Sequence, residues 1–216
     1  MGARLRLAVF GAIGLLTIFN ANNANSASEC LSADPDVRIL QCTAVIESAS
    51  PGNLVLAGAY SNRGMAYAQK GQYNLALADY NNAIKNDPSF ALAYNNRCYV
   101  RAQLMQFDGA LADCQNSLRL GPRDPRILDS RAYVYLRMGK YPEAINNEVL
   151  ALSPKLADSL FGRGVAKLRA GDHAGATKDF EAAKAIDQDI VKHMAASGLT
   201  LDAATPVPTG APVSTP

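Results

Sequence analysis

Apolar residues recur along the middle of the chain with the period of an α-helix, in pairs of stretches separated by a short break. In the first pair, Tyr60, Met65 and Tyr67 form the apolar side of the leading stretch. The break that follows, Lys70-Gly71-Gln72, contains a glycine, which favours a tight turn. The pattern predicts two helices of about fourteen residues each, joined as a hairpin.

The helix pair is repeated along the sequence. The segment YSNRGMA at residues 60–66 returns as YNNRCYV at residues 94–100, thirty-four residues later. Aligning the repeated segments divides the chain into units at 57–90, 91–124, 125–156 and 157–190. Because each hairpin exposes an apolar face until the next one stacks on it, the stability of such a chain comes from the array.

The third unit departs from the pattern. From Ala144 to Pro154 is ten residues, against twelve from Ala76 to Pro88. Its second helix also lacks the aromatic residue that the first unit has at Tyr80. We expect this helix to end early or to shift the pitch of the array.

Short helices are predicted at both ends of the array. Asp34 can cap a helix whose first position is Pro35, and a short segment after the fourth unit ends at Gly198. Helices at these places would cover the apolar faces left open at the ends of the array. The segment 200–216 is rich in Pro and Thr and has no periodicity, which predicts a disordered tail.

The thirty-four-residue period, the small residues at its eighth and twentieth positions and the proline at its thirty-second resemble the tetratricopeptide repeat (TPR) family. The resemblance implies an all-α fold, a right-handed α-solenoid of about four helix-turn-helix units with N-terminal and C-terminal capping helices. The implied organisation is a signal peptide at 1–27, an N-terminal capping region at 28–56, TPR 1 at 57–90, TPR 2 at 91–124, TPR 3 with a short second helix at 125–156, TPR 4 at 157–190, a capping helix at 191–199 and the tail at 200–216.

The first residues have the layout of an export signal. Arg4 and Arg6 precede an apolar run from Leu7 to Phe19, which is short for a membrane span of about 20 residues. Small and amide residues follow, and we expect cleavage between Ala24 and Ser28. The predicted location is periplasmic or secreted, with no membrane span after signal removal; an uncleaved N-terminal membrane anchor is the alternative.

Charge and residue types exclude several function classes. Without Arg4 and Arg6 the chain has 19 basic and 19 acidic residues, which argues against a nucleic-acid or anionic-membrane binder. The two histidines, His173 and His193, have no ligand or catalytic set at motif spacing, and phosphate-binding and nucleophile motifs are lacking. We therefore expect no enzyme activity, no cofactor and no metal site.

The four cysteines lie beyond the predicted signal segment. Cys98 takes the place of a small residue in the first helix of its unit, and Cys114 that of an aromatic residue in the second. Each lies eight residues from the turn near Gln106, so antiparallel helices bring them to the same height. We predict disulfides Cys98–Cys114 and Cys30–Cys42, with metal binding or free thiols as the alternatives.

Charged residues recur at equivalent places in the units. We interpret them as ion pairs within the array, with a ligand-binding ladder as the alternative. The arginines of the first helices are Arg63, Arg97, Arg131 and Arg163, and the acids of the second helices are Asp79, Asp113 and Asp179.

The resemblance also implies a binding surface, because TPR arrays line their concave face with first-helix residues. Aromatic and hydrogen-bonding groups there would suit an extended peptide or a partner protein. The alternative is that these residues only pack against neighbouring helices or the tail. The candidate residues are Met65, Asn95, Tyr99, Arg126, Asp129, Tyr133, Arg137, Phe161 and Arg169. The Lys-Asn clamp for a terminal carboxylate is not reproduced, since Ser61 and Met65 stand at its first two positions.

Together these features predict a non-catalytic protein-protein interaction scaffold of the cell envelope. Two other roles remain open: an accessory subunit that docks an envelope enzyme, such as a cell-wall hydrolase or protease, and a self-assembling structural protein. The sequence identifies neither the partner nor the oligomeric state.

Overall fold

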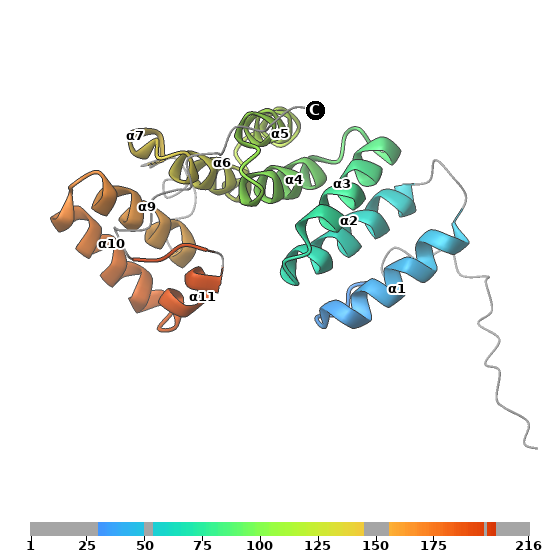
Figure 1. Cartoon of the computed structure of the whole chain (residues 1–216), viewed down its shortest axis with the longest axis horizontal. Coiled ribbons are helices and arrows are strands. Elements are labelled where there is room, and N and C mark those ends of the chain that lie inside the picture. The colour runs from blue at the N-terminus through green and yellow to red at the C-terminus, as the bar shows by residue number, and fades with distance from the viewer. Residues whose placement is uncertain (1–29, 50–53, 145–155, 197, 202–216) are drawn as a thin grey trace, which may run out of the picture.

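A computed structural model describes residues 30–49, 54–144, 156–196 and 198–201. In these ranges every regular element is an α-helix, and the helices follow one another around an arch (Figure 1). Their bounds are α1 (Pro35–Ser48), α2 (Leu54–Gln69), α3 (Tyr73–Asn86), α4 (Ala91–Gln103), α5 (Phe107–Leu120), α6 (Pro125–Arg137), α7 (Tyr141–Ala144), α9 (Ala157–Arg169), α10 (His173–Ile186) and α11 (Ile190–Ala196). The all-α solenoid fold is confirmed.

The helices pack as successive hairpins. The tight pairs are α2 with α3, α4 with α5, and α9 with α10, while α3 and α4 join the first hairpin to the second. Glycines at positive φ close three of the turns, with φ of 70° at Gly71, 74° at Gly139 and 88° at Gly171. The second hairpin places Met105 at the equivalent position with φ of 59°, a conformation that costs a non-glycine residue about 1–2 kcal/mol.

Helix α1 covers the first hairpin, as predicted. The Asp34 side chain accepts hydrogen bonds from the backbone N–H groups of Asp36 and Val37, and Pro35 stands at the first helical position. The helix packs on α2, which begins at Leu54, three residues before the predicted start of its unit.

Helix α11 covers the other end of the array. It begins at Ile190, one residue before the predicted boundary, and the backbone N–H of Leu199 returns to the carbonyl of Met194 at 3.0 Å. Gly198, with φ of 78°, permits this return. Ile190, Met194 and Leu199 are buried in the same apolar cluster as residues of α9, so the predicted cap is present.

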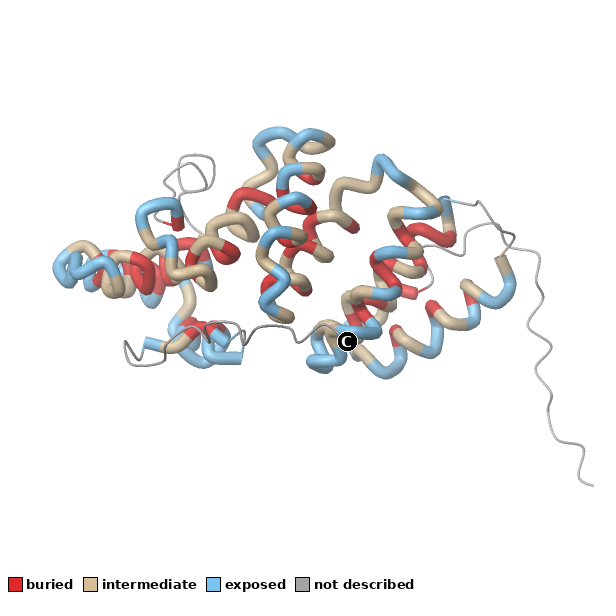
Figure 2. The backbone as a smooth tube through the Cα atoms, turned by 45° about the horizontal axis from the view of Figure 1, so that its top comes forward, coloured by how far each residue is buried: buried red, intermediate tan, exposed pale blue. Residues whose placement is uncertain are grey.

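Buried residues lie between the helices and exposed ones on their outer sides (Figure 2). The described chain has one large apolar cluster from α4 to Leu199 and two smaller ones, around Cys30 and around Tyr80. None of the described helices combines the length and apolar character that crossing a membrane requires. The predicted signal segment, the shortened helix of the third unit beyond Ala144 and the tail from residue 202 lie outside the described residues.

Candidate functional site

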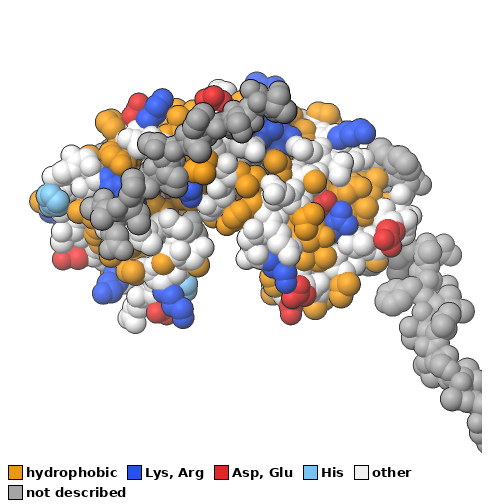
Figure 3. All heavy atoms as spheres, in the orientation of Figure 1, with side chains coloured by type: hydrophobic (Ala, Val, Ile, Leu, Met, Phe, Trp, Pro, Cys, Tyr) orange, Lys and Arg blue, Asp and Glu red, His pale blue; other side chains and the backbone are white. Residues whose placement is uncertain are grey.

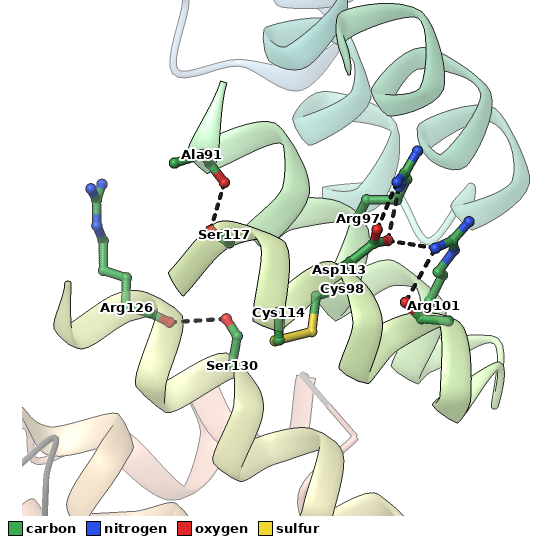
Figure 4. The surroundings of a disulfide bond; sticks show 10 residues. Ala91, Arg97, Cys98, Arg101, Asp113, Cys114, Ser117, Arg126 and Ser130 are labelled. Carbon is green, nitrogen blue, oxygen red and sulfur yellow. Dashed lines mark hydrogen bonds and ion pairs between the residues drawn. A yellow bond between two sulfur atoms is a disulfide. The ribbon is translucent and has the colours of Figure 1, made fainter. Parts of the chain in front are cut away.

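Helix α4, which carries the candidates Asn95 and Tyr99, is joined to α5 by a disulfide. Cys98 of α4 and Cys114 of α5 are bonded, with Cα atoms 5.4 Å apart, and both side chains are fully buried (Figure 4). Cys30 is bonded to Cys42 of α1, with Cα atoms 5.0 Å apart. The structure thus holds the two pairs that the sequence predicts.

Ion pairs also join the two helices in the hairpins α2–α3, α4–α5 and α9–α10. The Arg63 guanidinium binds Asp79 through two hydrogen bonds of 2.8 Å, and Arg97 binds Asp113 at 2.8 and 2.6 Å. Arg163 and Asp179 repeat the arrangement in the last hairpin. The three carboxylates are buried. The prediction of ion pairs within the array is confirmed for these three units.

The ion pairs extend from one hairpin to the next. Arg63 donates from its remaining nitrogen to Thr43 of α1 at 3.0 Å, and Arg97 donates to Asn81 of α3 at 2.8 Å. Each arginine therefore ties its own hairpin to the preceding element. These groups are engaged within the protein, which favours the structural interpretation over a ligand-binding ladder.

A groove of about 480 Å³ lies on the inner side of the arch. In the space-filling view the arch is hollowed between the α1–α3 end and the lobe that contains α11 (Figure 3). Residues of α2, α3, α4, α6 and α11 line the groove, and none of the eleven is charged. They are Met65, Ala68, Gln69, Gly71, Tyr73, Tyr80, Asn95, Asn96, Tyr99, Ser130 and Ala196.

Asn95 is the most informative of these residues. Its side chain is 6% exposed, and its Oδ1 atom has no hydrogen-bond partner among the described residues. A buried acceptor without a partner costs about 1–3 kcal/mol, so such a group is expected to meet a donor when the site is filled. The groove therefore contains a polar group suited to a ligand N–H.

Beside the groove, four side chains form one network. Gln103 donates to the Tyr99 hydroxyl at 2.7 Å, and Arg137 donates to Gln103 at 2.8 Å and to the Tyr133 hydroxyl at 3.1 Å. The Tyr99 and Tyr133 rings are 5.3 Å apart, centroid to centroid. Burial raises the pKa of Tyr133 to about 12, so this hydroxyl stays protonated at neutral pH. The network holds Tyr99 in a fixed orientation at the groove.

Two family models match the sequence, and both describe the tetratricopeptide repeat. One covers residues 57–90 and the other residues 130–189. The chain therefore contains tetratricopeptide repeats. Among curated proteins, none matches the sequence.

Solved TPR structures share the fold. MamA from Desulfovibrio magneticus RS-1, residues 41 to the end, superposes with a TM-score of 0.61 at 18% identity, over 76% of this chain and 93% of that one. Another MamA structure gives 0.58 at 20% identity, over 74% and 92%. YrrB, described as a TPR protein with an unusual peptide-binding site, gives 0.54 at 20% identity, over 76% and 84%.

On this TPR array the predicted binding residues separate into groups. Met65, Asn95 and Tyr99 line the groove. Asp129 and Tyr133 line a second cavity of about 40 Å³ beneath α6, α9 and α11. Arg137 belongs to the network beside the groove.

The remaining candidates are not in the groove, and Phe161 is a correction. Its side chain is 1% exposed and its ring lies 5.2 Å from that of Phe180, so it is a core residue rather than a ligand contact. The physical reason is that α11 covers the end of the TPR array at this point. Arg126 is exposed and pairs with Asp124, and Arg169 lines neither cavity.

Asp129 is held differently from the other acids of the TPR units. It accepts a hydrogen bond of 2.7 Å from the Ser159 hydroxyl, and Asp158 lies nearby. Burial raises the pKa of its carboxyl, and the hydrogen bond from Ser159 only partly offsets this. This arrangement suits a residue that orients α9 against α6, not a ligand contact in the groove.

Eight of the eleven groove residues of the TPR array were not among the candidates, including Tyr73, Asn96, Ser130 and Ala196. Tyr73 comes from a second helix and Ala196 from the cap, whereas the family pattern points only to first helices. Asn96 and Ser130 are neighbours of the candidates Asn95 and Asp129, so the repeat alignment placed them one residue away.

The histidines were expected to lie on the surface without a partner set. His193 is exposed, but its Nδ1 lies 2.7 Å from the carboxylate of Asp187, a pairing that the sequence reading missed. Within the described ranges, no group of three or more His, Cys, Asp or Glu side chains is arranged to hold a metal ion.

Proposed function

We propose that this TPR protein is a non-catalytic protein-protein interaction scaffold of the cell envelope, which binds an extended segment of a partner in its groove. The observation that carries the proposal is the uncharged groove with the unpartnered acceptor of Asn95 and the fixed ring of Tyr99. An extended backbone supplies N–H donors, and its side chains need pockets between aromatic rings. The peptide-binding site described for the structurally similar YrrB supports the same use of the fold.

Affinity purification after crosslinking in the envelope tests the proposal. Capture of one dominant partner is expected, and it should be lost in Tyr99→Ala/Tyr133→Ala and reduced in Met65→Lys, which introduces a charge into the groove. Tyr94→Ala/Tyr135→Ala is the matched control, because these tyrosines lie on the same two helices and line neither cavity. Thermal unfolding of each variant separates loss of binding from loss of fold. Equal loss in the control and the groove variants would contradict the proposal.

The identity of the captured partner decides the role. A hydrolase or protease would make this protein an accessory subunit, while capture of only its own copies would make it a structural assembly. Sizing the purified protein at high concentration separates the last case, since a monomer excludes self-assembly.

Export is part of the proposal. It is supported by the layout of residues 1–27 and by two buried disulfides, which persist in oxidising compartments. Cell fractionation with N-terminal sequencing should find the protein outside the cytoplasm, beginning between Ala24 and Ser28. Unfolded, unreduced protein should take up no alkylating reagent. A cytoplasmic protein with four alkylated thiols would overturn this part.

A further inference from the structure

The tail of the chain matches the groove in charge. The eleven groove-lining residues are uncharged. Residues 202–216, DAATPVPTGAPVSTP, contain four prolines and a single charged side chain, Asp202. Burying side chains of residues 203–215, which are uncharged, in an uncharged groove avoids the large desolvation penalty that an ion would meet there.

The tail begins six residues after a residue that lines the groove. Ala196, the last residue of α11, lines it, and the described chain ends at Leu201. Leu199 is buried against the cap, which fixes where the chain leaves the fold. An extended chain spans about 3.3 Å per residue, so the five residues from Asp202 to Pro206 reach about 17 Å from that point. The proline-containing part is therefore within reach of the groove without any rearrangement of the helices.

The hydrogen-bonding groups are complementary. A proline-rich segment favours the polyproline II conformation, in which backbone groups have no partners within the segment. Aromatic-lined grooves recognise such segments at low entropic cost. Here Tyr73 and Tyr99 supply rings, Gln69 and Asn96 supply amide donors for backbone carbonyls, and the buried Oδ1 of Asn95 can accept one of the N–H groups between the prolines.

We propose that residues 202–216 bind in the groove of their own chain and so compete with the partner segment. This inference rests on the proposed function, because it assigns a second, internal occupant to the same groove. Binding in the same chain is favoured over binding to a second copy since a short tether gives an effective concentration in the millimolar range. At micromolar protein, a second copy offers the same tail at a concentration about a thousandfold lower.

Paramagnetic broadening tests where the tail lies. The four native cysteines are paired, so Ser214→Cys in the chain from Ser28 takes a single nitroxide label. Backbone amide signals of Met65, Asn95 and Ser130 should broaden, while those of Gln115 and Glu181, exposed on other helices, should not. The same label in Pro206→Asp/Pro208→Asp should broaden none of them, because charges now enter an uncharged groove.

An isotope mixture separates the two copies. Chains at natural isotopic abundance that carry the nitroxide are mixed with ¹⁵N-labelled chains that lack it. Only broadening caused by contacts between chains is then detected. No broadening in this mixture, together with broadening within one chain, supports the proposal. Broadening only in the mixture would show that the occupant is the tail of a second copy and would overturn it. No broadening in either sample would also overturn it.

A peptide with the sequence of residues 202–216, carrying a fluorescent label, measures the competition. If the tail binds with a dissociation constant near 100 µM against an effective concentration of about 1 mM, opening the groove raises the affinity for the added peptide about tenfold. Pro206→Asp/Pro208→Asp should therefore bind the peptide about tenfold more tightly than the natural chain, and adding Met65→Lys should abolish binding. Equal affinity for both chains would overturn the inference and leave the capture result for Tyr99→Ala/Tyr133→Ala unaffected. Conversely, a positive tail result without any captured partner would contradict the proposed function alone.

Discussion

The first and second hairpins fill the same space between their helices with different atoms. In α2–α3, a Cβ atom added to Gly64 would lie 3.0 Å from the Tyr80 ring, so the ring occupies the room that the glycine leaves. In α4–α5, Cys98 and Cys114 stand at the equivalent positions and are bonded. The last hairpin has a glycine–aromatic contact like that of the first. A Cβ atom added to Gly164 would lie 2.6 Å from the Phe180 ring. The contact is thus set by paired substitutions, not by either residue alone.

The polar contacts of the two hairpins differ less. Asp79 binds one arginine, Arg63, whereas Asp113 binds both Arg97 and Arg101, the latter at 2.7 Å. The second hairpin therefore has both a covalent link and a doubly paired carboxylate. It lies in the middle of the array and carries Asn95 and Tyr99 of the groove on α4.

The largest effect should come from removing the doubly paired carboxylate. Asp113→Ala leaves two arginines without their buried partner and should cost about 3–5 kcal/mol of unfolding free energy. Asp79→Ala, which releases one arginine, should cost less. Urea unfolding of both variants measures the difference, and equal losses would show that Arg101 adds nothing to the second hairpin.

Removing the Cys98–Cys114 disulfide should have the second-largest effect on stability. Cys98→Ala/Cys114→Ala should lose about 2–4 kcal/mol, because the unfolded chain gains freedom and the core loses volume. Cys30→Ala/Cys42→Ala is the comparison, since that bond holds only the chain before α1 to α1. Calorimetry should show a lower melting temperature for the first variant, and a drop confined to the second would mean that the middle hairpin does not depend on its bond.

Replacing the disulfide by the glycine–aromatic contact of the first hairpin should change the unfolding free energy less. Cys98→Gly/Cys114→Tyr builds the contact of the first hairpin into the second, and it should recover about 1–2 kcal/mol relative to the double alanine variant by filling the cavity. Cys98→Gly alone is the control and should recover nothing. If the paired variant is no more stable than the double alanine protein, the two hairpins do not share one packing geometry.

The smallest effect concerns Asp129, a carboxylate with no arginine partner among the described residues. Burial raises the pKa of Asp129 above its unfolded value, so folding stability falls as the pH rises through the raised pKa. Asp129→Asn can keep the Ser159 hydrogen bond without the charge, and it should gain about 1 kcal/mol at pH 7. Well below the unfolded pKa the natural residue is protonated in both states, and the gain should vanish. A gain that is independent of pH would contradict this cause.

The acids paired with arginine respond to pH in the opposite direction. For Asp179, burial alone would raise the pKa, but hydrogen bonds from Arg163 and Lys167 outweigh burial and lower it. Its contribution to stability is therefore present above the unfolded pKa and is lost as the pH falls through the lowered one. Asp129 and Asp179 show how the partner of a buried acid sets the sign of its pH dependence.

Much of this fold could be predicted because its contacts are local and repeated. The Arg–Asp pairs and the Cys98–Cys114 bond each join residues sixteen positions apart across one hairpin, so the repeat period and the turn determine them. The cap at Asp34 follows from residue types alone. The pattern repeated four times is what made these inferences possible.

The site was harder to predict because it depends on how the array ends. Phe161 occupies a concave position by the family pattern, yet it is buried with residues of α11. Ala196 lines the groove for the same reason, and the repeat alignment contains no information about where the cap lies. Tyr133 and Arg137 were predicted as ligand contacts, but in the structure Arg137 donates hydrogen bonds to both Tyr133 and Gln103.

Each disulfide joins cysteines that are close in the sequence, and this affects how the chain folds. Each bond joins cysteines that are consecutive in the sequence, 12 and 16 residues apart. If the chain is exported N-terminus first, as proposed, it presents both members of a pair before the next cysteine arrives. Oxidation in order of emergence gives the native pairing of the three that four cysteines allow, without later thiol–disulfide exchange, which takes seconds to hours. Each bond can form independently of the other, before the rest of the array has stacked.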